Sequence, residues 1–216
     1  MPNTPEISAW LAFQTCVEDS EWLNIPALET MILELVRVHW ARPENHSVLQ
    51  PHLGCYVWGA DEPSKAVEIR ATHDGEPGSA DRAPMIRVDV SQEGEMQQLT
   101  MNNVIGTSDD GGTEILGWRC QARITVAHTM PSKALAIHAA TSSLVLLAAA
   151  GRLIQNRYRL QLTGYNLAGM KPAAPVKDNP RTYRVDAMAK LVFTFLVSVN
   201  SETHRLNALD TSITPS

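Results

Sequence analysis

Apolar positions at helical spacing predict a long early helix over residues 26–40. Its apolar stripe recurs at intervals of three and four residues and consists of Leu28, Met31, Ile32, Leu35, Val36 and Trp40. Asn24 is placed to cap the start of this helix, and Pro26 falls in its first turn. The pair Arg42–Pro43 ends it, because the residue before a proline is disfavoured in helical conformation. A shorter stripe predicts another helix over residues 7–17.

The longest predicted helix spans residues 129–156. No charged residue occurs between Lys133 and Arg152, and the helix carries small or apolar side chains on nearly all of its sides. Its uncharged stretch approaches the length of a membrane span. However, His138 and the run 141–143 interrupt its apolar character. We therefore expect a helix buried on several sides, against its own sheet and a neighbouring subunit, and not a membrane segment.

Alternation of apolar and polar residues predicts two long strands. In residues 183–199 the odd positions are apolar and most even positions are polar, over a length far beyond the common strand of about 5–6 residues. Residues 115–128 alternate in the same way. Shorter β-like runs are 56–58, 66–71, 85–90, 97–104 and 157–163. Residues 72–84, rich in Gly, Pro and Asp, predict the exposed tip of a long hairpin, and 107–113 predict a turn. Residues 166–182 predict an extended arm or a loop.

These elements together predict an α+β fold. We expect a single mixed or antiparallel β-sheet packed against the long helix, with N-terminal helices and a long β-hairpin insertion over about 60–112. Residues 1–200 would form one domain, and 201–216 a flexible C-terminal tail. Of the 216 residues, 44% are hydrophobic and 19% charged, which is typical of a globular chain and argues against disorder and coiled coils.

The first half of the chain is net acidic and the second half is net basic. Residues 1–112 carry 18 acidic and 6 basic residues, and residues 113–216 carry 5 acidic and 12 basic residues. Such a split suits subunits that pair through complementary fields. The candidate contacts with another subunit or a partner are Arg119, Arg123, Arg152, Arg157, Arg159, Arg181, Arg184 and Lys190. The basic run 152–184, interleaved with tyrosines, also fits contacts with nucleic acid.

No motif for catalysis or cofactor binding is present in the sequence. GxGxxG, GxxxxGK[ST], HExxH and GxSxG are all missing, and the three cysteines lie far apart with no CxxC. The seven histidines lack metal-ligand spacing and are expected at the surface or at helix ends. Asp186 is expected to pair with Arg119, Arg123 or Arg184 across strands and not to act as a catalytic base. We expect no cofactor, no metal and no enzymatic activity.

The order of elements resembles the tail terminator proteins of long-tailed bacteriophages. The resemblance is carried by WRCQARITV (118–126), by the helix that follows it at 131–155, and by RTYRVDAMAKLVFTFLVSV (181–199). It implies a structural virion protein, assembled in the host cytoplasm, that forms a homo-oligomeric ring of six subunits. The ring would cap the tail tube and join it to the head–neck connector.

The resemblance also implies partners: the tail tube protein, the neck or head-completion protein and, where one is present, the sheath. DNA would pass through the lumen, and no membrane, cofactor or catalytic residue is implied. Two alternatives stay open. One is another phage neck, head-completion or baseplate protein, and the other is a nucleic-acid-binding protein or an enzyme whose site is assembled from scattered residues.

Overall fold

The computed structural model describes residues 23–47, 53, 55–72, 83–99, 104–107, 113–158, 161–177 and 179–200. The predicted helix at 7–17, most of the predicted hairpin tip at 72–84 and the predicted tail at 201–216 lie outside these residues, and so does Arg159.

One eight-stranded mixed sheet forms the centre of the fold, with the principal strand order β1-β2-β5-β8-β6. The α+β prediction is confirmed. β1 and β2 are parallel, and the other pairs are antiparallel. The strands are β1 (Glu68–Ala71), β2 (Met85–Gln92), β3 (Gln97–Gln98), β4 (Val104–Thr107), β5 (Thr113–Met130), β6 (Leu162–Met170), β7 (Ala174–Val176) and β8 (Asn179–Asn200).

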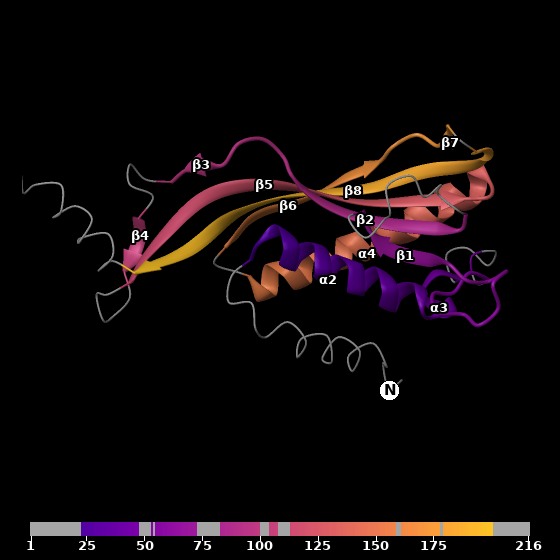
Figure 1. The fold of residues 1–216 in the computed structure, drawn as a ribbon, viewed down its shortest axis with the longest axis horizontal. Helices are drawn as coiled ribbons and strands as arrows, with labels where there is room; N and C mark the ends of the chain where they lie inside the picture. The colour runs from indigo at the N-terminus through magenta and orange to yellow at the C-terminus, as the bar shows by residue number, and fades with distance from the viewer. Residues whose placement is uncertain are drawn as a thin grey trace, which may run out of the picture.

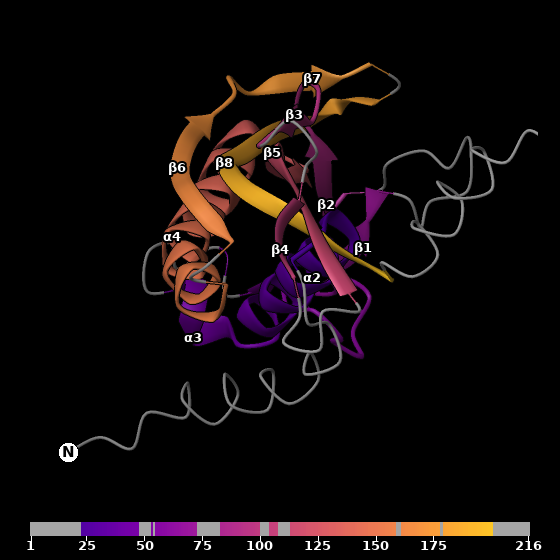
Figure 2. The same ribbon diagram turned by 90° about the vertical axis from the view of Figure 1, so that its left-hand side faces the viewer.

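The helices α2 (Ile25–Trp40) and α4 (Lys133–Arg157) cover one face of this sheet, as Figures 1 and 2 show. The short helix α3 (Pro43–Ser47) packs against α2. The predicted cap of α2 is confirmed, because the side-chain oxygen of Asn24 accepts a hydrogen bond from the amide of Ala27 at 2.8 Å. The core lies between the helices and the sheet, and each layer contributes fully buried side chains such as Trp40, Leu147 and Phe193.

The helix α4 is the one described helix that is long and apolar enough to cross a membrane by length and composition. Half of its most apolar stretch is nevertheless buried within the fold. Ala136, Ala139 and Ala140 bring it close to the sheet, and Gly151 lets it approach β6, since a Cβ there would lie 2.4 Å from the ring of Tyr165. α4 therefore packs as the core helix of this fold.

The central strands extend beyond the part of the sheet that the helices cover. β5 and β8 pair without interruption from Met130–Tyr183 to Thr113–Asn200. β2 reaches only residues 122–129 of β5, and β6 reaches only residues 187–193 of β8. Beyond these limits β3 and β4 pair with β5, and this portion projects at the left of Figure 1. We call it the arm: β3, β4, and residues 113–119 and 194–200.

Several predicted elements were wrong in detail. Segments 66–71 and 85–90 do not form a hairpin, because β1 and β2 run parallel, whereas the two strands of a hairpin are antiparallel. The predicted strand at 157–163 is the end of α4 and the start of β6. The segment 166–182, predicted as an extended arm or a loop, contains the rest of β6, β7 and the start of β8. Within the predicted strand at 97–104, the described residues belong to β3 at its start and to β4 at its end.

Candidate functional site

The candidate contact cations fall on two sides of the molecule. In β5 and β8 the buried, helix-facing residues are the even ones from Cys120 to Val126 and the odd ones from Val185 to Phe193. By alternation, the four cations Arg119, Arg123, Arg184 and Lys190 project from the opposite, uncovered face of the sheet. Arg152 and Arg157 belong to α4, in the helical layer, and Arg181 is exposed near the start of β8.

Glu93 joins two of these cations on the uncovered face. Arg123 and Lys190 are cross-strand partners, and both bind one carboxylate oxygen of Glu93, Lys190 at 3.0 Å and Arg123 through a short ion pair. The hydrogen bonds from Lys190 and then Arg123 hold the pKa of Glu93 below its usual value. This contact fixes the chain after β2 against the sheet, so that both cations are engaged within their own subunit.

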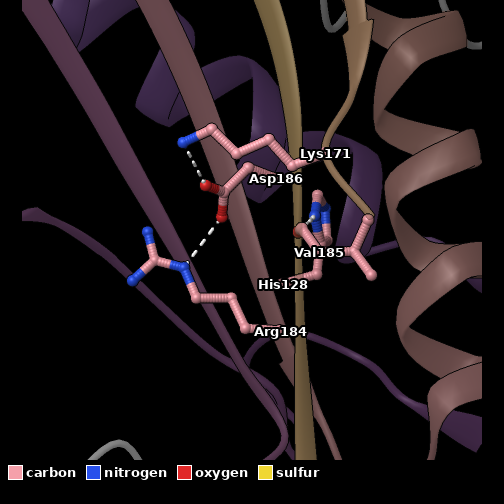
Figure 3. A network of polar contacts seen from close by, with 5 residues as sticks. All are labelled: His128, Lys171, Arg184, Val185 and Asp186. Atoms are coloured by element: carbon pink, nitrogen blue, oxygen red, sulfur yellow. Dashed lines mark hydrogen bonds and ion pairs between the residues drawn. The ribbon is translucent and has the colours of Figure 1, made fainter. Parts of the chain in front are cut away.

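Asp186 organises a second ionic cluster on the same face (Figure 3). Its carboxylate accepts hydrogen bonds from Arg184 Nε at 2.8 Å and Lys171 Nζ at 3.1 Å. Burial favours the neutral acid, but these two cations outweigh it and lower the pKa of Asp186. The predicted ion pair between Asp186 and Arg184 is confirmed, although both residues lie on the same strand and not on neighbouring strands. The second cation bound to Asp186 is Lys171, where Arg119 or Arg123 was expected. Asp186 is therefore a structural anion.

Three histidines gather around Trp40 on the helical side of the sheet. The ring of His46 stacks on Trp40 with centroids 4.5 Å apart, and the centroid of the His128 ring lies 6.5 Å from that of Trp40. The ring centroids of His39 and His46 are 6.0 Å apart. The expectation of surface or end-capping histidines was wrong for His46 and His128, which have no exposed surface. The burial of His128 could have been predicted from the alternation in β5, because His128 lies two residues after Val126 and therefore on the same, buried face.

Two of these histidines contact serines of α4. His128 Nε2 lies 2.8 Å from Ser143 Oγ, and His39 Nε2 lies 2.8 Å from Ser142 Oγ. The other ring nitrogen of His128, Nδ1, faces the carbonyl oxygen of Val185 at 3.3 Å. Since a carbonyl only accepts, Nδ1 carries the proton, and Nε2 accepts from Ser143. Burial lowers the pKa of His39 and of His128 to about 4, so that both rings are neutral at pH 7.

A serine within hydrogen-bond distance of a histidine is the geometry of an activated nucleophile. Here Ser143 and His128 have no exposed surface at all, and Ser142 has none either. A substrate cannot reach these hydroxyl groups without opening the core. These pairs satisfy buried polar groups, which is what a serine and a histidine in a packed interior require.

Large apolar side chains are exposed on and beside the arm, and on α4 and β6. Met96, Leu99 and Ile105 are 45%, 42% and 43% exposed on and beside the arm, and Leu99 and Ile105 lie together over Gly117. We call these three residues the arm surface. Val145, Leu167 and Met170 are 55%, 46% and 39% exposed, and we call them the α4–β6 surface. The sequence predicted spare apolar surface on α4. It gave no signal for the exposed residues of β6, which lie in the segment predicted as an extended arm or a loop.

The strand β6 lies in direct contact with α4. The hydroxyl of Thr141, one turn before Val145, points to the sulfur of Met170 at 3.8 Å. Tyr165 packs on Gly151 and donates to the carbonyl oxygen of Leu147 at 2.7 Å. α4 and β6 therefore contact each other directly, at Thr141 and Met170 and again at Gly151 and Tyr165.

No group of three or more His, Cys, Asp and Glu side chains in the part of the chain that the structure describes is arranged to hold a metal ion. Compared with protein-family models and with curated proteins, the sequence matches none.

Proposed function

We propose that this chain is a structural, ring-forming virion subunit that resembles the tail terminators of long-tailed phages. The observation that carries the proposal is the arm, in which β5 and β8 continue together past the helix-covered sheet. Strands of 18 and 22 residues are not needed to build the core of a chain of this size. Their extension is useful where a subunit must reach a neighbour.

The side chains on the arm support an assembly role. Leu99 and Ile105 remain more than two-fifths exposed, although each is large and apolar. Contiguous apolar groups at the surface of a soluble chain mark contact sites, because burying them against a partner removes apolar area from water. An isolated subunit cannot bury them in its own core, since the arm extends away from the helices.

The polar groups favour a structural role over the catalytic and nucleic-acid alternatives. Arg123, Lys190 and Arg184 are bound to carboxylates of the same chain, which leaves less positive charge on the uncovered face for phosphate contacts. The Ser–His pairs are closed to substrates. These contacts support a structural subunit, because the polar side chains involved stabilise the fold of their own chain.

In the proposed ring, six copies surround a lumen that admits DNA. The ring caps the tail tube beneath the head–neck connector. The tail tube protein and a neck or head-completion protein would be its neighbours. The net charge of −5 would limit adhesion of DNA to the lumen. Another neck or baseplate position would use the same arm and differ in the neighbouring proteins.

Negative-stain electron microscopy of the purified protein tests the proposal. We expect closed rings with a central opening, of uniform diameter. Uniform small particles without an opening, at every concentration that gives a clear field, would contradict a ring-forming role.

A further inference from the structure

The arm carries further apolar side chains on the side that continues the helix-covered face of the sheet. The cross-strand pair Cys120 and Phe193 is buried on that face. Since β5 and β8 pair without a register shift, alternation puts two more cross-strand pairs of the arm on the same side. The first pair consists of Trp118 and Phe195, whose ring centroids lie 6.3 Å apart. We call the four partly buried residues of these pairs the arm platform: Leu116, Trp118, Phe195 and Val197.

The arm platform and the arm surface lie on opposite sides of the same two strands. Leu99 and Ile105 pack over Gly117, which alternates with the platform residues of β5 and therefore faces the other way. The platform itself lies where β5 and β8 continue past α2 and α4 (Figure 1). Covering its adjoining aromatic and branched side chains would remove further apolar area from water.

The N-terminal part of the chain enters the fold at the base of the arm platform. Leu23, the first described residue, is fully buried in the core, and its amide donates to Gln161 Oε1 at 3.0 Å. Gln161 in turn holds β8, because its carbonyl oxygen accepts from the amide of Thr194 at 2.8 Å and its Nε2 donates to the carbonyl oxygen of Thr194 at 3.2 Å. Thr194 is the first arm residue of β8 and directly precedes Phe195 of the platform.

We infer that residues 7–17 of the same chain pack on the arm platform as an amphipathic helix. Residues 1–22 lie outside the described part of the chain, and the sequence of 7–17 predicts a helix with one apolar stripe. A helix of eleven residues is marginal on its own in water, so it needs a surface on which to bury that stripe. The stripe consists of Ile7, Trp10, Leu11, Phe13 and Val17. This contact lies within one subunit and does not depend on the proposed ring.

The length of chain before Leu23 suits this occupant. Residues 18–22 form a connection that spans at most about 17 Å when extended. Val197, the far end of the platform on β8, lies only about 10 Å along the strand from Thr194. The predicted helix would be about 16 Å long, and the arm strand 194–200 extends for roughly 20 Å. A segment on so short a connection has an effective concentration in the millimolar range, which favours it over the same segment of another molecule.

Thiol labelling of the full-length chain tests this contact. Val197→Cys places a thiol in the arm platform, and the native thiol of Cys55, which is exposed, serves as the reference in the same molecule. Trp10→Asp and Val17→Asp each put a charge into the apolar stripe, and Thr15→Asp is the matched control on the polar side of the predicted helix. Mass spectrometry assigns the label to its position, and thermal unfolding shows which variants remain folded.

We expect the thiol at position 197 to react about tenfold more slowly than Cys55, because a covered thiol reacts only when its cover opens. Either stripe variant should remove most of this protection, and Thr15→Asp should preserve it.

A thiol at position 197 that reacts as fast as Cys55 without any stripe variant overturns the inference, and so does protection that persists in a folded stripe variant. Protection that fades on dilution would mean that another molecule covers the platform, and it overturns the contact within one subunit. The ring is tested separately, because a failure to observe rings changes none of these expected rates.

Discussion

Gly151 of α4 lies directly under the aromatic ring of Tyr165 on β6, and a Cβ at Gly151 would be 2.4 Å from Cε1 of that ring. An alanine would ordinarily stabilise a helix by about 1 kcal/mol relative to glycine. Here Gly151→Ala should instead destabilise the subunit by about 1–3 kcal/mol, because α4 and β6 must separate. Urea denaturation of the single variant measures this.

A double-mutant cycle distinguishes this close contact from a general effect on the helix. In the background Tyr165→Leu, the change Gly151→Ala should be neutral or stabilising, since the ring that it would strike has been removed. An equal loss of stability in both backgrounds would show that the packing of α4 on β6 does not depend on this pair.

Phe193 and Lys190 of β8 differ sharply in their environment. Phe193 is 1% exposed beneath the helices, and Lys190 is exposed and paired with Glu93. Phe193→Ala should lower the free energy of unfolding by about 3–5 kcal/mol. Lys190→Ala should lower it by less than about 1 kcal/mol, as is usual for an exposed ion pair. If the order of the two losses in chemical denaturation were reversed, the inward face of β8 would be assigned wrongly.

The buried histidines should make stability depend on pH. The pKa of His128 is about 4 in the folded protein and 6.5 when unperturbed, so the unfolded chain takes up the proton first. The stabilising effect of its neutral ring is complete above pH 6.5 and is lost progressively as the pH falls to about 4. His39 should act in the same direction over the same interval, with its pKa of about 4.

Thermal unfolding at pH 7, 6 and 5 checks this expectation. For His128 alone the loss between pH 7 and pH 5 is about 2 kcal/mol, since each unit of pH below the unperturbed pKa and above the folded one costs about 1.4 kcal/mol. The variant His128→Asn should show a shallower dependence on pH, whatever its stability at pH 7. Identical slopes for the variant and the wild type would mean that His128 takes up a proton without unfolding.

The success of the sequence predictions depended on how local each signal is. The cap at Asn24 and the alternation that buries Leu191 and Phe193 are set by neighbours in the chain, and both were predicted correctly. The direction of β1 relative to β2 is not contained in alternation, which is the same for parallel and antiparallel strands. β6 was missed because it has few branched residues, lacks charge and contains a register shift at Gly169, whose φ is +86°.

The candidate site was harder to predict because its contacts join distant segments. Glu93 meets Lys190 across 97 residues, and His39 meets Ser142 across 103. Composition could show that α4 has apolar surface to spare. It could not show that Met170 would lie against α4, because the contact of Met170 with Thr141 joins residues 29 positions apart in the chain.

The molecular mass of the purified wild-type protein in solution tests the central claim most directly. Native mass spectrometry should show a closed oligomer of the 23.7 kDa chain, with six copies as the expected number and no ladder of larger species. A mass of one chain at the highest soluble concentration, confirmed by light scattering, would contradict the account of this protein as a ring-forming subunit.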